Sequence, residues 1–235
     1  MSWLEYLILF AFPLAGGLVA IPLRNARPDL LNLALSFSGA FLIGITFMSL
    51  LPQLFSTGMP DLGVFIMVGF FLQILLDQLS KGVEHGHIHV PDKVSSRFGL
   101  TILAGLSIHA FLEGIPLSGM HSHALMIGIA VHKIPAAFTL ASVLLKTGTR
   151  VKIMPAHLLF FIAMTPLAAW LTEWAALAEG EAFRNTLNLI YAMVIGSFLH
   201  ISTTILFEVS TKHHRFTLYR LMAISAGLAM ALLTV

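Results

Sequence analysis

The chain has 235 residues, of which 57% are hydrophobic and 10% are charged, and its mean hydropathy is +0.90. Soluble domains carry about 25% charged residues, so this composition excludes a soluble globular protein and predicts an integral membrane protein. The absence of cysteine excludes disulfides and thiolate metal ligands. The formal net charge of +2 does not indicate a nucleic-acid partner, because the basic residues lie in links between apolar segments.

Eight apolar segments follow one another along the chain. Each is long enough to cross a bilayer as a helix that rises about 1.5 Å per residue. The links between them are short, which predicts one all-α integral membrane domain over residues 1–235 with the lipid bilayer around it. The predicted transmembrane helices cover 4–23, 33–55, 62–80, 98–119, 123–145, 153–173, 186–207 and 216–234.

Lysine and arginine are distributed unevenly between the two sets of links. If the N-terminus lies outside, the outer links contain Arg184 alone, and the inner links contain most of the basic residues, as the positive-inside rule requires. We therefore expect a multi-pass protein of an inner or plasma membrane, with both termini outside the cytoplasm. The basic residues assigned to the inner side are Arg24, Arg27, Lys81, Lys93, Arg97, Lys146, Arg150, Lys152, Lys212 and Arg215 in the links, and Arg220 near the start of the last segment.

The second and seventh segments share a short pattern. "GAFLIGITF" at 39–47 and "GSFLHISTT" at 196–204 both begin with Gly-x-Phe-Leu. Because these two segments cross in opposite directions, the pattern favours an inverted repeat of helices 1–3 and 6–8 around helices 4 and 5. Inverted repeats are a common transporter architecture, in which the substrate site lies near the midplane.

The fourth and fifth segments contain ionisable residues inside apolar sequence. His109 and Glu113 are four residues apart and share one face of the fourth helix, while His132 lies near the middle of the fifth. A charge at the bilayer centre costs about 2.5–3.5 kcal/mol on insertion scales, so such residues normally face the bundle interior and serve a function. Imidazole and carboxylate groups suit zinc, iron, manganese, cobalt, nickel or cadmium. The three residues are therefore candidate metal ligands.

At these residues the chain resembles the ZIP family of divalent-metal transporters. Members typically carry a His-x-x-x-Glu-Gly motif in the fourth helix, which reads "HAFLEG" at 109–114 here, and a His-x-x-Pro-Glu-like motif in the fifth, which reads "HKIPA" at 132–136. The resemblance implies transport of a divalent cation, with zinc as the principal candidate, toward the cytoplasm through a metal centre between these helices. It implies His109, Glu113 and His132 as the primary ligands, and the metal as a transported substrate.

The chain departs from the family pattern at this metal centre. Ala136 stands where a Glu is common, and Ala110 and Lys133 stand where an Asn or Asp is frequent. The change at Ala136 removes one primary ligand, and those at Ala110 and Lys133 remove the usual ligands of a second metal, so we expect one bound cation rather than two. As a hypothesis, the Lys133 ammonium reaches Glu113 and supplies the positive charge that a second metal supplies elsewhere in the family.

Other histidines are weaker candidates for metal binding. The predicted cytoplasmic loop 81–97 contains "EHGHIH", with His85, His87 and His89, and clustered histidines bind metals. A solvated loop without metal explains these residues equally well. His200, in the seventh segment, is a further weak candidate.

Two other function classes stay open at this point. A membrane-embedded metallohydrolase would also bury histidines around zinc, but it needs a general base besides the ligands, and the midplane offers Glu113 alone. A non-transporting, metal-sensing relative is favoured by the missing ligand at Ala136. We expect a transporter that is not an enzyme and uses no cofactor. A homodimer is left open.

Overall fold

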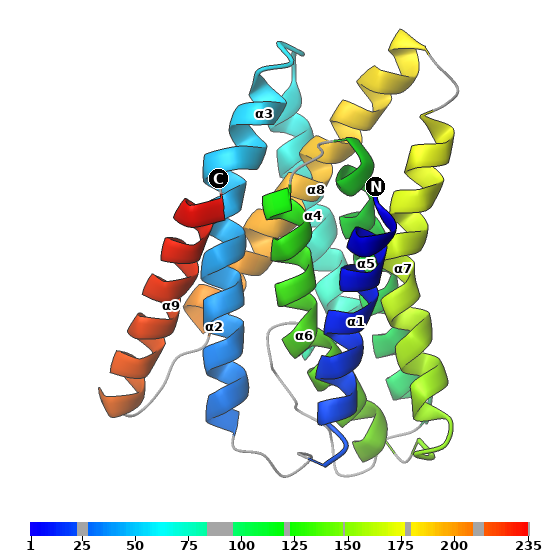
Figure 1. Cartoon of the computed structure of the whole chain (residues 1–235), viewed down its shortest axis with the longest axis vertical. Helices are drawn as coiled ribbons and strands as arrows, with labels where there is room; N and C mark the ends of the chain where they lie inside the picture. The colour runs from blue at the N-terminus through cyan, green and yellow to red at the C-terminus, as the bar shows by residue number, and fades with distance from the viewer. Residues whose placement is uncertain are drawn as a thin grey trace.

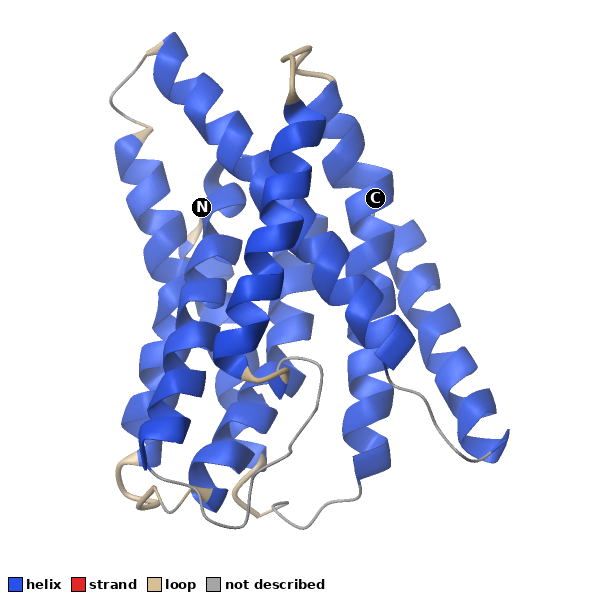
Figure 2. Cartoon of the chain, turned by 180° about the vertical axis from the view of Figure 1, so that it is seen from behind, coloured by secondary structure: helices blue, strands red, loops and turns tan. Residues whose placement is uncertain are grey.

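The structure is a computed structural model, and it describes residues 1–22, 28–83, 96–119, 123–147, 149–176, 180–208 and 214–234. Within these ranges the regular secondary structure is helical, as Figures 1 and 2 show from opposite sides. The elements are α1 (Trp3–Val19), α2 (Pro28–Ile45), the π-helical turn η1 (Thr46–Leu50), α3 (Leu51–Phe55), α4 (Leu62–Ser80), α5 (Ser96–Gly119), α6 (His123–Lys146), α7 (Met154–Ala175), α8 (Glu181–Glu208) and α9 (His214–Thr234).

Each of the eight predicted segments contains a helix, and the second consists of α2, η1 and α3 in succession. Six of the described helical stretches are long and apolar enough to cross a membrane, which confirms the membrane-protein class. The first and last segments contain the shorter apolar helices Trp3–Val19 and Leu218–Thr234. The 17 residues of α1 rise about 25 Å, less than the roughly 30 Å of a hydrocarbon core, because the helix ends at Val19 instead of residue 23.

Local sequence explains how one helix begins and another continues past a proline. Ser2 and Glu5 form a capping box before α1: Ser2 Oγ accepts from the Glu5 N–H at 3.4 Å, and Glu5 Oε2 accepts from the Ser2 N–H at 2.7 Å. In the second segment, η1 ends at Leu50, two residues before Pro52, which has no N–H to donate to the preceding turn. Widening one turn keeps this segment helical across the proline.

The helices pack as two groups of four. The most extensive contacts join α1 to α6, α5 to α7, α2 to α9 and α4 to α8. Further packing of α1 on α7 and of α2 on α8 completes a first helix group of α1, α5, α6 and α7 and a second helix group of α2, α4, α8 and α9. Contacts of α2 with α6 and of α4 with α5 connect the groups. The fourth and fifth predicted helices therefore share a group with the first and sixth.

Glycines allow the backbones of α4 and α8 to touch. Gly69 on α4 faces the backbone of Met193, and Gly196 on α8 faces the carbonyl of Ile66, so that a Cβ atom at either glycine would overlap those atoms. Small residues are the usual means of close helix packing in membranes. The second helix group is thus held together partly by direct backbone contact.

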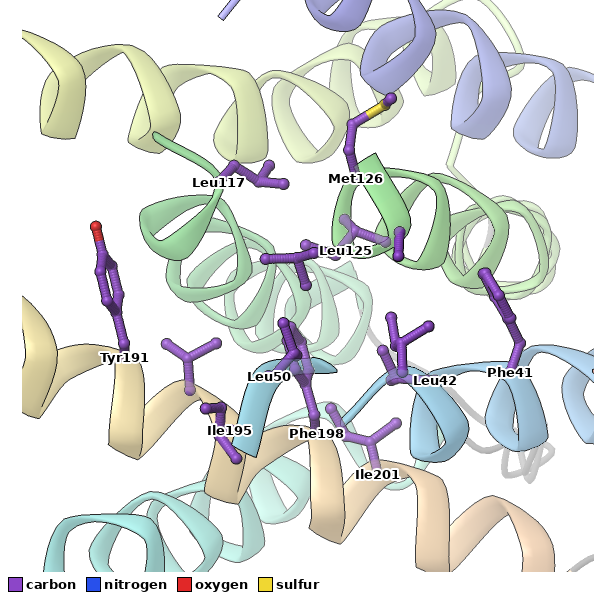
Figure 3. Close-up of a cluster of buried hydrophobic side chains, with 14 of the residues drawn as sticks. Phe41, Leu42, Leu50, Leu117, Leu125, Met126, Tyr191, Ile195, Phe198 and Ile201 are labelled. Atoms are coloured by element: carbon purple, nitrogen blue, oxygen red, sulfur yellow. The ribbon is translucent and has the colours of Figure 1, made fainter. Parts of the chain in front are cut away.

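A buried apolar cluster fills the space between the two helix groups (Figure 3). Most of its members come from α2, α6 and α8, and the other helical elements contribute one residue each. Several members lie near the end of α5 and the start of α6. We call it the interface cluster, and the side chains labelled in Figure 3 are Phe41, Leu42, Leu50, Leu117, Leu125, Met126, Tyr191, Ile195, Phe198 and Ile201.

Candidate metal site

His109 and Glu113 meet on one face of α5, as their spacing predicts. His109 Nε2 lies 2.9 Å from Glu113 Oε1, and both side chains are buried. The two residues are one helical turn apart, so the helix itself fixes this contact. A carboxylate and an imidazole nitrogen are therefore held side by side inside the bundle.

His132 on α6 completes a group of three. Its Nε2 lies 3.9 Å from Glu113 Oε1, and its ring stands at 87° to that of His109, with centroids 6.3 Å apart. One ligand atom from each of the three residues lies within 4.8 Å of the others. Ligand atoms about 2.0–2.2 Å from a tetrahedral ion are roughly 3.5 Å apart, so binding needs side-chain shifts of roughly 1 Å. The group fits a divalent metal ion.

The sequence next to Glu113 sets how closely α5 approaches α7. Gly114 faces the carbonyl of Thr165 and the Cβ of Ala168, and a side chain at this position would overlap both. α5 and α6 also continue through Pro116 and Pro135 without ending. The ligands are therefore carried by long helices that pack against α7 and α1 within the first helix group.

Lys133 is 1% exposed, and its ammonium is directed toward α7. Nζ donates a hydrogen bond to Thr165 Oγ1 and lies 4.9 Å from the centroid of the Phe161 ring. Thr165 Oγ1 in turn donates to the carbonyl of Ala110 at 2.6 Å. No direct ion pair joins the described side chains of Lys133 and Glu113, both of which are buried.

The two alanines in the motifs lie in apolar surroundings. Ala110 and Ala136 are both buried and belong to a hydrophobic cluster that includes Leu106 and Leu140. A methyl group offers no ligand atom. The described side chains that converge at this site therefore offer three candidate ligands, His109, Glu113 and His132.

The weaker candidate His200 lies apart from this group. His200 is on α8, where its Nε2 lies 2.6 Å from Oδ2 of Asp77. It is not among the residues whose ligand atoms converge with those of the triad. His85, His87 and His89 lie outside the described residues, so their role as metal ligands stays a prediction.

Sequence reasoning missed a chain of polar side chains beside the triad. Gln73 on α4 is fully buried, and its Oε1 lies 3.2 Å from His109 Nδ1 and accepts from Ser197 Oγ at 2.7 Å. Its Nε2 donates to Asp77 Oδ1 at 3.1 Å, and Asp77 also contacts His200. A signal was present in the sequence, because an amide and an acid four residues apart in an apolar helix lie on one face.

Comparison with known proteins gives distant relatives. No protein-family model matches the chain. A protein named zinc transporter ZIP9-B, from Xenopus laevis, is 27% identical over 164 residues, which are 65% of this chain and 54% of that protein. Zinc transporter ZIP9 from Micropogonias undulatus is 29% identical over 168 residues, 65% of this chain and 53% of that protein.

A bacterial relative also matches. A protein named zinc transporter ZupT, from Chlorobium phaeovibrioides, is 31% identical over 119 residues, 43% of this chain and 45% of that protein. The chain spans about half the length of the curated relatives it matches. All three relatives are named as transporters and none as an enzyme.

Proposed function

We propose that the chain is a divergent member of the ZIP family of divalent-metal transporters and that it carries a divalent cation across the membrane. The observation that carries this proposal is the buried group of His109, Glu113 and His132 between α5 and α6. Burying three such groups in an apolar bundle is costly, and it is explained if they bind an ion.

The ligand chemistry favours zinc as the substrate. Two imidazole nitrogens and a carboxylate form a common zinc-binding set, and a three-ligand site leaves a position for water. Iron, manganese, cobalt, nickel and cadmium accept the same donors and are the competing substrates. The relatives named zinc transporters support the choice of zinc.

The site is proposed to hold one cation, with Lys133 in place of a second. The methyl groups of Ala110 and Ala136 offer no ligands, and an ammonium next to the site repels another cation. The hydrogen bond from Lys133 Nζ to Thr165 Oγ1 holds the ammonium between α6 and α7. We propose that this fixed charge compensates Glu113 through space while the transported ion binds to the three ligands.

The surroundings of the triad support transport toward the cytoplasm. Part of the interface cluster, including Leu117, Leu125 and Met126, lies at the end of α5 and the start of α6, so apolar side chains pack on that side of the triad. On the other side, Asp77 and His200 continue a polar path toward the ends of α4 and α8. With both termini outside an inner or plasma membrane, these ends face the cytoplasm, where the loop 81–97 would receive the ion.

We propose that the two helix groups move relative to each other during transport. All three ligands lie on the first helix group, so a shift of this group changes the side to which the site opens. The pairing of α1 with α6 corresponds to that of α7 with α5, and α2 with α9 corresponds to α8 with α4. An inverted repeat of helices 1–3 and 6–8 produces this correspondence, which supports the predicted repeat.

Zinc flux into proteoliposomes tests the proposed function. His109→Ala, Glu113→Ala and His132→Ala should each abolish most of the flux at normal expression. His123→Ala is the matched control, because that side chain is 80% exposed and lies outside the triad. Near-normal flux in all three ligand variants contradicts the proposal. Zinc binding without flux in the unmodified protein identifies a metal sensor instead.

A further inference from the structure

The contact between Gln73 and His109 joins the two helix groups at the metal site. Gln73 belongs to α4 in the second helix group, whereas His109 and the other ligands belong to the first. Gln73 is 0% exposed, and its Oε1 lies 3.2 Å from His109 Nδ1. A buried amide from a helix that carries no ligand therefore contacts a ligand directly.

The surroundings of Gln73 define which way its amide points. The Asp77 carboxylate accepts hydrogen bonds, so the Gln73 NH₂ faces Asp77 Oδ1 at 3.1 Å. The Gln73 carbonyl oxygen then faces His109, and it also accepts from Ser197 Oγ at 2.7 Å. Since this oxygen accepts, His109 Nδ1 carries the hydrogen, and the lone pair is on Nε2. Nε2 is the nitrogen that lies 2.9 Å from Glu113.

We propose that Gln73 is a positioning residue of the metal site, which fixes the His109 ring and its Nδ1–H tautomer so that Nε2 is presented to the cation. This inference rests on the proposed function. Metal-binding histidines commonly donate their second N–H to an oxygen acceptor, and loss of such a partner typically costs about 10- to 100-fold in metal affinity. Gln73 lies on the second helix group and His109 on the first. The amide therefore holds the His109 ring only as long as the two helix groups stay in their present arrangement.

The test is a zinc titration of the purified full-length protein against a competing chelator. Gln73→Leu removes the acceptor and should weaken zinc binding about 10- to 100-fold. Gln73→Asn keeps the amide but shortens the side chain and withdraws it from His109, so it should also weaken zinc binding. This variant provides the test if Gln73→Leu does not fold. Ser197→Ala is the matched control, because it removes the other donor to the same oxygen without touching His109.

An exchange of the acid and the amide provides the rescue. In Gln73→Glu/Asp77→Asn the introduced carboxylate can accept from His109 and Ser197, the introduced amide can donate to it, and the net charge is unchanged. This double variant should restore binding to within a few-fold of the unmodified protein. A purely structural role of Gln73 predicts no such recovery.

Three outcomes overturn the positioning role. They are unchanged affinity in both single variants of Gln73, a loss in Ser197→Ala as large as that in Gln73→Leu, and no recovery in the exchange variant. His109→Ala, measured alongside, distinguishes failure of the positioning role from failure of the proposed metal site. If His109→Ala abolishes binding but Gln73→Leu does not, the metal site stands without the positioning role. If His109→Ala binds zinc normally, the proposed site falls, and the positioning role falls with it.

Discussion

Nε2 of His132 on α6 lies 3.9 Å from Oε1 of Glu113 on α5, and this contact brings α6 into the candidate metal site. The same carboxylate oxygen lies 2.9 Å from His109. Glu113 is therefore the group that the two histidines share, and its charge should matter more to binding than its shape.

Glu113→Gln keeps the shape of the side chain and removes its charge. Loss of a hydrogen-bond partner of a metal ligand costs roughly 10- to 100-fold in affinity. We expect zinc affinity to fall by more than this, because Glu113→Gln weakens a direct ligand. Chelator competition on purified protein measures this. Glu5→Gln is the control, since a Gln at that position still completes the capping box of α1. Equal affinities in the Glu113 variant and the unmodified protein would remove the carboxylate from the site.

Lys133→Ala should leave the Glu113 charge less compensated. We expect zinc to bind more tightly and to be released more slowly, so that flux falls although affinity rises. Lys133→Asp should go further and allow a second ion to bind, because it replaces an ammonium with a ligand. Metal-to-protein stoichiometry and flux decide this, with Lys146→Ala at the end of α6 as the control. Two tightly bound ions in the unmodified protein, or no change in either variant, would rule out the substitute charge.

Acid should weaken zinc binding. A histidine must be neutral to ligate a metal, so protons compete with zinc for His109 and His132 as the pH falls from about 8 to about 5. Affinity is therefore highest at the upper end of this range and declines toward the lower end. The dependence of log affinity on pH should become less steep in His132→Ala, which has one competing histidine fewer. An affinity that does not change with pH argues against histidine ligands.

Gly114→Ala should disturb both packing and binding. Its added Cβ would overlap the Thr165 carbonyl and crowd Ala168, so α5 must move away from α7 and carry Glu113 with it. Overpacking of this kind costs about 1–3 kcal/mol. We expect a lower melting temperature and weaker zinc binding than in the unmodified protein. Gly63→Ala on α4 is the matched control, because nothing lies within 4 Å of its added Cβ. Equal stability of the two variants contradicts the packing argument.

The sequence predicted the helices and part of the site for clear physical reasons. Long apolar runs determine where the chain can cross a membrane, so each predicted segment contains a helix. The contact of His109 with Glu113 follows from helix geometry, since residues four apart share a face. The placement of His132 beside them came from the family resemblance, because no spacing along the chain relates α5 to α6.

The rest depends on packing between helices, which the sequence pattern does not specify. Lys133 was expected to reach Glu113, but its ammonium donates a hydrogen bond to Thr165 on α7. Gln73 could be recognised as a polar residue in an apolar helix. Its contact with His109, however, arises only from the way α4 packs on α5.

The burial of Lys133 next to Glu113 has an electrical consequence. With Lys133 and Glu113 both ionised and the histidines neutral, the charges at the empty site sum to zero, and the zinc-loaded site has a charge of about +2. A membrane potential contributes about 2.3 kcal/mol per elementary charge per 100 mV. An inside-negative potential would therefore draw the loaded site inward, while the return of the empty site would proceed without electrical work.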